Sequence, residues 1–224
     1  MVDAGGKVVG FAVGRRTDHP VSPMDTQALD QQLEFLREID KLKRIDRQSP
    51  LLDRSRRENS AEHSWHLAMY AWLLAGWSSG PVDLGRVIRM LLLHDVVEID
   101  AGDTPIHGGG SPAAQEADEL RAAERIFGLL PGPQRDEMMA LFREFEDAQT
   151  EDAKFAKALD RFQPLLVNVF TGGGTWSESR VAHEQVLERY GPTIRRGAPQ
   201  LWAVAERMVA RHFGTETSAG RSPA

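Results

Sequence analysis

The chain has 224 residues, of which 41% are hydrophobic, so it can bury a normal core and we expect one domain. It contains no cysteine, which excludes disulfides, thiolate metal sites and cysteine nucleophiles and favours a reducing, cytoplasmic setting. The net charge of −6 argues against a nucleic-acid polymer as partner. The longest apolar run, Ala68–Trp77, is too short to cross a membrane.

The N-terminal part of the sequence predicts a leader, a helix and a basic loop. Residues 1–26 are rich in Gly, Pro, Asp and Arg without any period, so we expect a flexible leader. Apolar residues at helical spacing predict a first helix over 27–46. Residues 41–57 then carry a charge of +5, against −11 for the rest of the chain. This segment suits a small anionic ligand, although a solvated charged face is an equally simple interpretation.

The remaining elements are also predicted to be helical. Asn59, with Glu62 three residues later, forms a capping-box pattern that begins a helix over 60–77. The next helix, 83–100, contains the stretch Met90–Ile99, which is apolar on nearly every side and therefore predicted to be buried. Further helices are expected at 112–130, at 134–147, from Thr150 to the Gly172–Gly174 turn, at 177–190 before Gly191-Pro192, and at 199–213.

No segment shows sustained strand alternation, so the predicted fold class is all-α. We expect a single globular helical bundle over 27–214, followed by a disordered tail at 215–224.

A few ionisable residues lie within the apolar helices. His94, Asp95 and Glu98 are inside the central helix, where an ionised carboxylate is costly unless it is paired or bound to a metal. His63 and Asp160 lie on two other predicted helices. Two imidazoles and two carboxylates would suit Mn²⁺, Co²⁺, Fe²⁺, Zn²⁺ or Mg²⁺. An adjacent His-Asp pair alone is weak evidence, because a buried histidine is more often a hydrogen-bonded core residue.

Three segments in order carry a more specific signal: ENSAEHSWH at 58–66, LLHDVVEIDAGD at 92–103 and AKFAKALDRFQP at 153–164. Together they resemble the H…HD…D pattern of the HD-domain metal-dependent phosphohydrolases, in the branch that contains the bacterial 5′-deoxynucleotidases and their eukaryotic relatives. The resemblance covers about residues 30–190. It implies an HD-domain helical bundle in which one divalent ion is bound, with the ligands His63, His94, Asp95 and Asp160.

The same resemblance implies that Glu98 and Asp103 occupy the catalytic acidic positions. Independently of the family, Glu98 lies one turn after His94, so its carboxylate can reach the same place as the histidine. The alternative is that Glu98 only holds a histidine in one tautomer. How the two acids divide their roles stays open.

The basic loop departs from the family. In the deoxynucleotidase branch this loop carries an Arg-Trp pair that contacts the nucleotide, whereas this chain has Arg47-Gln48-Ser49-Pro50 without an aromatic residue. Because guanidinium groups bind phosphate bidentately, Arg47, Arg54 and Arg56 are the candidates to hold the substrate. His66 and His107 are more simply interpreted as surface or supporting histidines.

These features predict a metal-dependent phosphomonoesterase that acts on (deoxy)nucleoside 5′-monophosphates. The alternatives are an HD-domain hydrolase of another small phosphoester and a non-catalytic module that senses a nucleotide; a two-iron redox enzyme would need more ligands than the motifs provide. The resemblance also suggests a homodimer. Apolar residues late in the chain would offer its interface, namely Trp176, Leu201, Trp202 and Val204.

Overall fold

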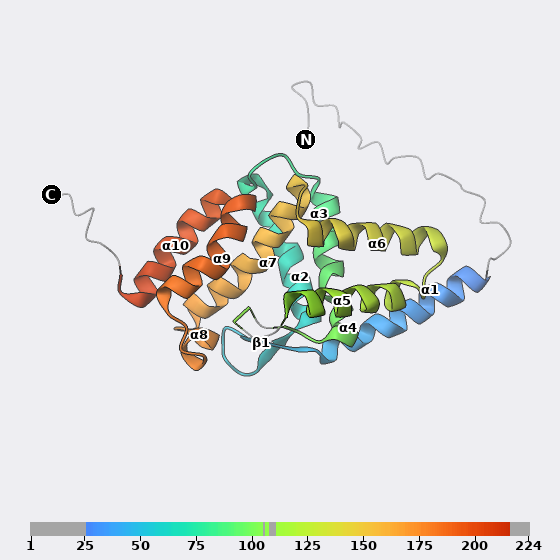
Figure 1. Ribbon diagram of the computed structural model, residues 1–224, viewed down its shortest axis with the longest axis horizontal. Helices are drawn as coiled ribbons and strands as arrows, with labels where there is room; N and C mark the ends of the chain where they lie inside the picture. Colours follow the sequence, from blue (N-terminus) through green and yellow to red (C-terminus); the bar gives the residue numbers. More distant parts are fainter. Residues whose placement is uncertain (1–25, 105, 108–110, 216–224) are drawn as a thin grey trace, which may run out of the picture.

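The computed structural model describes residues 26–104, 106–107 and 111–215, and these are almost entirely helical (Figure 1). The predicted all-α fold class is confirmed. The predicted leader and tail lie outside the described residues except at Thr26 and Thr215. In chain order the elements are α1 (Thr26–Ile39), η1 (Asp40–Arg44), β1 (Asp46–Pro50), β2 (Arg57–Asn59), α2 (Ser60–Leu74), η2 (Ala75–Trp77), α3 (Leu84–Leu93), η3 (His94–Val97), α4 (Glu98–Ala101), α5 (Pro112–Phe127), α6 (Gly132–Asp147), α7 (Glu151–Phe170), α8 (Gly174–Glu178), α9 (His183–Gly197) and α10 (Pro199–Phe213).

Helix α7 runs through the middle of the bundle and packs against α3, α6, α9 and α10 (Figure 1). It begins where the sequence predicts, because the Thr150 hydroxyl accepts a hydrogen bond from the backbone N–H of Ala153 at 3.1 Å. Phe155, Leu159 and Leu165 are fully buried, so α7 is a core helix over most of its length. Its one buried acid, Asp160, is therefore carried into the centre of the molecule.

Helix α9 contradicts one prediction. We expected Gly191-Pro192 to end a helix at residue 190, but α8 and α9 replace that helix, and α9 continues through both residues. A Cβ at Gly191 would lie 3.0 Å from the Trp202 ring of α10. Packing on α7 and α10 thus outweighs the single backbone hydrogen bond lost at the proline. At Gly197 the approach is closer still, since a Cβ there would overlap the Lys154 carbonyl of α7.

The central segment 83–100 is helical but not one regular helix. Helix α3 ends at Leu93, the chain tightens into the 3-10 turn η3, and α4 follows. The predicted burial is confirmed for Met90, Leu91, Val96 and Val97, whereas Leu92 is 49% exposed. A 3-10 turn advances about 120° per residue, so successive side chains of η3 diverge more widely than in an α-helix.

A short antiparallel hairpin, β1 paired with β2, was not predicted. Strands of five and three residues are too short to show an alternating pattern, which explains why the sequence did not indicate them. The hairpin lies beside α2 and α7 and directs the start of the basic loop toward the bundle.

The prediction of an apolar surface late in the chain is wrong for most of its residues. Trp176, Leu201 and Trp202 are buried, and of the four residues expected to form an interface only Val204 is exposed. Large exposed apolar side chains are instead found on α2 and η2, namely Trp65, Trp72, Leu73 and Trp77. No helix within the described ranges is long and apolar enough to pass through a membrane.

Candidate metal centre

His63 is positioned by the start of α2. The predicted capping box is present: the Asn59 side chain accepts from the backbone N–H of Glu62 at 2.9 Å, and the Glu62 carboxylate accepts from the backbone N–H of Asn59 at 3.2 Å. This cap fixes the first helical turn, in which His63 is fully buried. Its Nε2 lies 3.1 Å from Oδ1 of Asp160.

His94 and Asp95 come from the 3-10 turn η3. Nδ1 of His94 lies 2.9 Å from the Leu91 carbonyl oxygen, so this nitrogen is the one that donates a proton. Nε2 then faces Oδ1 of Asp95 at 3.0 Å and Oδ1 of Asp160 at 3.6 Å. The angles suit a hydrogen bond to neither carboxylate, and this buried nitrogen has no hydrogen-bond partner among the described residues.

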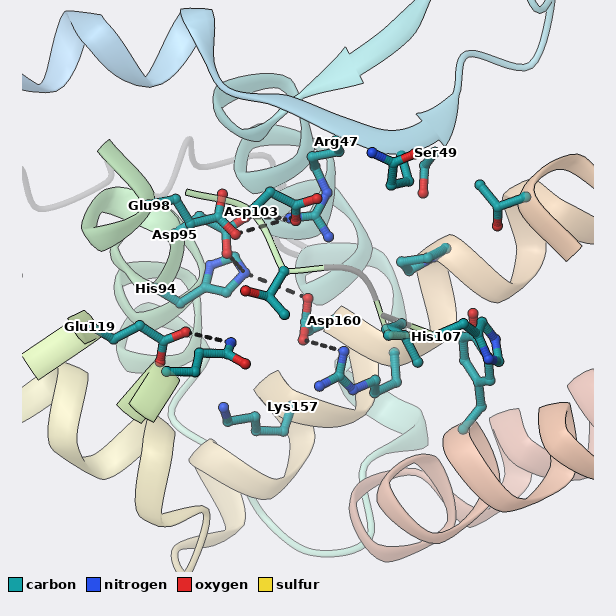
Figure 2. A pocket seen from close by; sticks show the side chains of 18 of the residues that line it. Arg47, Ser49, His94, Asp95, Glu98, Asp103, His107, Glu119, Lys157 and Asp160 are labelled. Atoms are coloured by element: carbon teal, nitrogen blue, oxygen red, sulfur yellow. Dashed lines mark hydrogen bonds and ion pairs between the residues drawn. The ribbon is translucent and has the colours of Figure 1, made fainter. Parts of the chain in front are cut away.

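The structure brings together all four residues that the sequence singled out as ligands. One ligand atom each from His63, His94 and Asp160 lies within 4.8 Å of the others. Asp95 joins them through its contact with His94, and Figure 2 shows the side chains of His94, Asp95 and Asp160 turned toward one another. Three separate elements, α2, η3 and α7, thus supply one buried cluster of nitrogen and oxygen donors.

The charges of this cluster fit a divalent cation. Burial would raise the pKa of Asp160, but the neighbouring imidazoles of His63, at 3.1 Å, and of His94, at 3.6 Å, hold it well below its ordinary value. Burial would lower the pKa of His94, but the carboxylates of Asp95 and Asp160 raise it to about 10. The unpartnered Nε2 of His94 is therefore a point between carboxylates where positive charge is stabilised. A metal ion bound there would take the place of the proton.

Glu58 lies beside the cluster and was not singled out in the sequence analysis. It is the buried middle residue of β2, and its Oε2 lies 3.6 Å from Nδ1 of His63, close but without a hydrogen bond. Its other oxygen accepts a hydrogen bond from Gln163 at 3.1 Å. A carboxylate on the second nitrogen of a ligand histidine fixes the tautomer and the ring orientation. Its position five residues before His63, the first histidine of the motifs, was the feature of the sequence that could have indicated it.

Glu98 and Asp103 form an acidic group with Asp95 around Arg47. The guanidinium Nη1 of Arg47 lies 2.9 Å from Asp95 Oδ2, 3.5 Å from Asp103 Oδ1 and 3.7 Å from Glu98 Oε1. Burial together with the Asp95 carboxylate raises the pKa of Glu98 to about 9, although Arg47 and the hydrogen bond donated by Ser60 act in the opposite direction. Burial likewise raises the pKa of Asp103. Both acids therefore hold protons more readily than an exposed carboxyl group.

A cavity of about 350 Å³ opens onto these groups, and it is lined by Arg47, His94, Asp95, Glu98, Asp103 and Asp160. Lys157 and Arg161, one turn apart on α7, add positive charge to its wall. His107 and Tyr190 line it as well, with ring centroids 5.7 Å apart, and Figure 2 shows His107 on the opposite side of Asp160 from His94. The cavity therefore has carboxylates at one end, aromatic rings at the other and two cationic side chains in its wall. Because it opens onto the candidate metal ligands, it is called the metal cavity below.

Residues 39–202 match the family model of the HD domain. The chain belongs to the HD-domain family. The human 5′-deoxynucleotidase HDDC2 is 29% identical over 135 residues, which are 60% of this chain and 65% of the human protein. This HD-domain protein thus spans slightly less than two thirds of the length of that relative.

Two other relatives cover more of their own length. The 5′-deoxynucleotidase YfbR of an Escherichia coli strain is 30% identical over 167 residues, which are 70% of this chain and 83% of YfbR. A crystal structure of a predicted metal-dependent phosphohydrolase from Magnetospirillum magnetotacticum MS-1 is 50% identical and has a TM-score of 0.78. That match covers 84% of this chain and 96% of the other.

Not all of the predicted site residues of this HD domain come together. Arg47 lines the metal cavity, but Arg54 and Arg56 line a different one, and the exposed Arg56 is paired with Glu62 at 2.5 Å. Lys157 and Arg161, which the sequence analysis did not single out, occupy the wall of the metal cavity instead. Their signal was available, because they flank Asp160 in the third motif.

The two additional histidines, His66 and His107, lie in different positions relative to the site. Nδ1 of His66 lies 3.4 Å from Gln163, which is bonded to Glu58, so His66 is at the edge of the ligand-supporting network. His107 lines the cavity itself. The sequence suggested a surface or supporting position for both; His66 lies beside the supporting network, whereas His107 lies in the wall of the cavity.

Proposed function

We propose that this HD-domain protein is a metal-dependent phosphohydrolase that removes the phosphate group from (deoxy)nucleoside 5′-monophosphates. The observation that supports this most strongly is the buried cluster of His63, His94, Asp95 and Asp160. It lies at the acidic end of a cavity whose wall also carries cationic side chains. The names of the human and Escherichia coli relatives, both 5′-deoxynucleotidases, support the substrate class.

The four ligands would hold one divalent ion of the Mn²⁺, Co²⁺, Fe²⁺, Zn²⁺ or Mg²⁺ type. Bound there, such an ion supplies Lewis-acid chemistry, lowering the pKa of a water molecule and polarising a phosphoryl oxygen. Glu58 would keep His63 in the orientation that this binding requires. Arg47 would hold Asp95, Glu98 and Asp103 close together despite their like charges.

Glu98 and Asp103 are proposed to move the protons. Hydrolysis of a phosphomonoester requires that a proton leaves the attacking water and that one reaches the alcohol oxygen that departs. Both acids have raised pKa values, and the value of about 9 for Glu98 allows it to carry a proton at neutral pH. Each lies beside Arg47 at the acidic end of the cavity.

Arg161 and Lys157 are proposed to contact the substrate phosphate, in place of the exposed Arg54 and Arg56. Arg161 is only loosely engaged, with Nη1 3.8 Å from Asp160 Oδ2, so its guanidinium can accept a new anionic partner. Lys157 is paired with Glu146 at 3.0 Å and would contribute mainly through its charge. The base would lie toward His107 and Tyr190, which offer ring faces at the far end of the cavity.

A phosphatase screen of nucleoside 5′-monophosphates and sugar phosphates, run with Mn²⁺, Co²⁺, Mg²⁺ and Zn²⁺, tests reaction, substrate and metal together. We expect turnover of several nucleoside monophosphates with weak discrimination among bases, and loss of turnover in Asp160→Asn. Preference for sugar phosphates would favour the hydrolase of another phosphoester. Bound metal and bound nucleotide with no phosphate released under any condition would favour the sensing module and would refute the proposal.

A further inference from the structure

A second cavity, of about 420 Å³, is bordered by the β hairpin and by the segment that joins α7 to α8. One wall comes from the loop between β1 and β2, with Arg54 and Arg56, and from Arg57 at the start of β2. The opposite wall is the turn from α7 into α8, with Thr171, Gly172, Gly174, Ser177 and Glu178. The cavity thus brings together three arginines and a glycine-rich turn that are more than 100 residues apart in the sequence.

Positive charge dominates this cavity. Among the described residues that line it, Glu178 is the only acid, and it pairs with Arg57 at 2.7 Å. Arg56 is paired with Glu62, outside the cavity. Arg54 has no side-chain hydrogen bond or ion pair with any residue that the structure describes, so its guanidinium retains its capacity to bind an anion.

The glycine-rich turn between α7 and α8 lies close to Arg54. Gly172 has φ +66, and a Cβ there would lie 3.2 Å from Nη2 of Arg54, so the guanidinium lies directly against bare backbone. The Ser177 hydroxyl, also on this wall, can donate a hydrogen bond to an anion. Guanidinium groups opposite a hydroxyl group and a glycine turn form an environment that suits a tetrahedral oxyanion.

We propose that this cavity is a second phosphate-binding site, distinct from the metal centre, which takes the phosphate group of a small phosphorylated molecule. It gives a role to three of the basic residues of 41–57, none of which lines the metal cavity. The proposal goes beyond the proposed phosphohydrolase activity and does not depend on it, since no residue of the ligand cluster lines this second cavity.

The two cavities are in contact through Arg57. Its guanidinium donates to the Gln48 carbonyl and to Glu178, and both Gln48 and Glu178 line the metal cavity. A phosphate that draws Arg57 toward the second cavity weakens its hold on Glu178, which then adds a free negative charge to the wall of the metal cavity. Occupation of the second site is therefore expected to alter anion binding at the first.

Binding can be tested in metal-free protein, in chelator, so that catalysis plays no part. Calorimetric titrations with inorganic phosphate, with ADP and with adenosine at matched ionic strength would measure affinity in the wild type, Arg54→Ala, Arg54→Lys and Arg161→Ala. We expect Arg54→Ala to weaken phosphate binding about tenfold or more, Arg54→Lys to restore part of it and Arg161→Ala, in the metal cavity, to leave it in place. Adenosine should not bind.

The comparison of ADP with inorganic phosphate identifies the source of the phosphate group. Binding of ADP at least tenfold tighter than phosphate would assign the site to a nucleotide, whereas equal affinities would assign it to free phosphate. Absence of phosphate and ADP binding at millimolar concentration, or binding lost in Arg161→Ala and retained in Arg54→Ala, would overturn the proposal. Melting temperatures of all variants would show that they are folded.

Discussion

The buried carboxyl group of Glu98 allows a prediction that requires no substrate. Its pKa is raised from 4.5 to about 9, first by burial and then by the Asp95 carboxylate. The unfolded chain releases this proton near pH 4.5, while the metal-free folded chain keeps it until about pH 9. The free energy of unfolding therefore falls as the pH rises between these values, because the folded state binds the extra proton.

The size of the effect follows from the same values. A difference of about 4.5 pH units corresponds to at most about 6 kcal/mol, at about 1.36 kcal/mol per unit. The surroundings of a buried charge relax, so a smaller change is realistic. We expect Glu98→Gln to raise the free energy of unfolding of the metal-free protein by ~1–3 kcal/mol at pH 8 and to leave it nearly unchanged at pH 5.

Urea unfolding in chelator at the two pH values, followed by circular dichroism, measures this difference. Glu188→Gln is a matched control, because Glu188 is an exposed residue of α9 outside both cavities, and we expect it to change stability little at either pH. If Glu98→Gln destabilised the protein at pH 8, or shifted its stability equally at pH 5 and pH 8, the argument that Glu98 is an electrostatically strained acid would be refuted.

Three further predictions concern the ligands, their support and the surface. We expect about one metal ion per chain in the wild type, and Asp160→Ala should lower both this metal content and the melting temperature. Two ions per chain in the wild type by elemental analysis, or an unchanged variant, would contradict this. Glu58→Gln should raise the Kd for Mn²⁺ by about 10- to 100-fold in calorimetry without altering the circular dichroism spectrum, and an unchanged Kd would show that Glu58 does not orient His63. We expect the wild type to be a dimer in light scattering and Trp72→Glu to be a monomer. The reason is that the exposed apolar residues of α2 lie on a helix without Lys or Arg and can pack against a second copy. A monomeric wild type would dismiss this interface.

The position of the candidate metal ligands was the most specific prediction from the sequence. The resemblance of three ordered motifs to the HD-domain pattern indicated His63, His94, Asp95 and Asp160 together, and the cost of burying an unpaired charge explained why these residues need partners. Local signals were also sufficient for the capping box of α2 and for the start of α7 at Thr150. These are features in which short-range sequence and long-range packing agree.

Features that depend on tertiary contacts were not predictable. The continuation of α9 through Pro192 requires the surfaces of α7 and α10, which no local pattern reveals. Arg54 and Arg56 were grouped with Arg47 because they share a loop, but the path of the hairpin carries them to a separate cavity. The exposure of Trp65 and Trp72 likewise depends on which face of α2 meets the bundle.

The direct backbone contact at Gly197 has a consequence for mutational screens. Any side chain at this position would push the end of α9 away from α7 at Lys154, about two turns before Asp160 on the same helix. A displacement of α7 would be transmitted to the carboxylate that both histidines face. Substitutions at Gly197, which contacts none of the candidate ligands, would therefore lower activity in a screen as substitutions of an active-site residue do. Only glycine is tolerated at this position unless α7 changes with it.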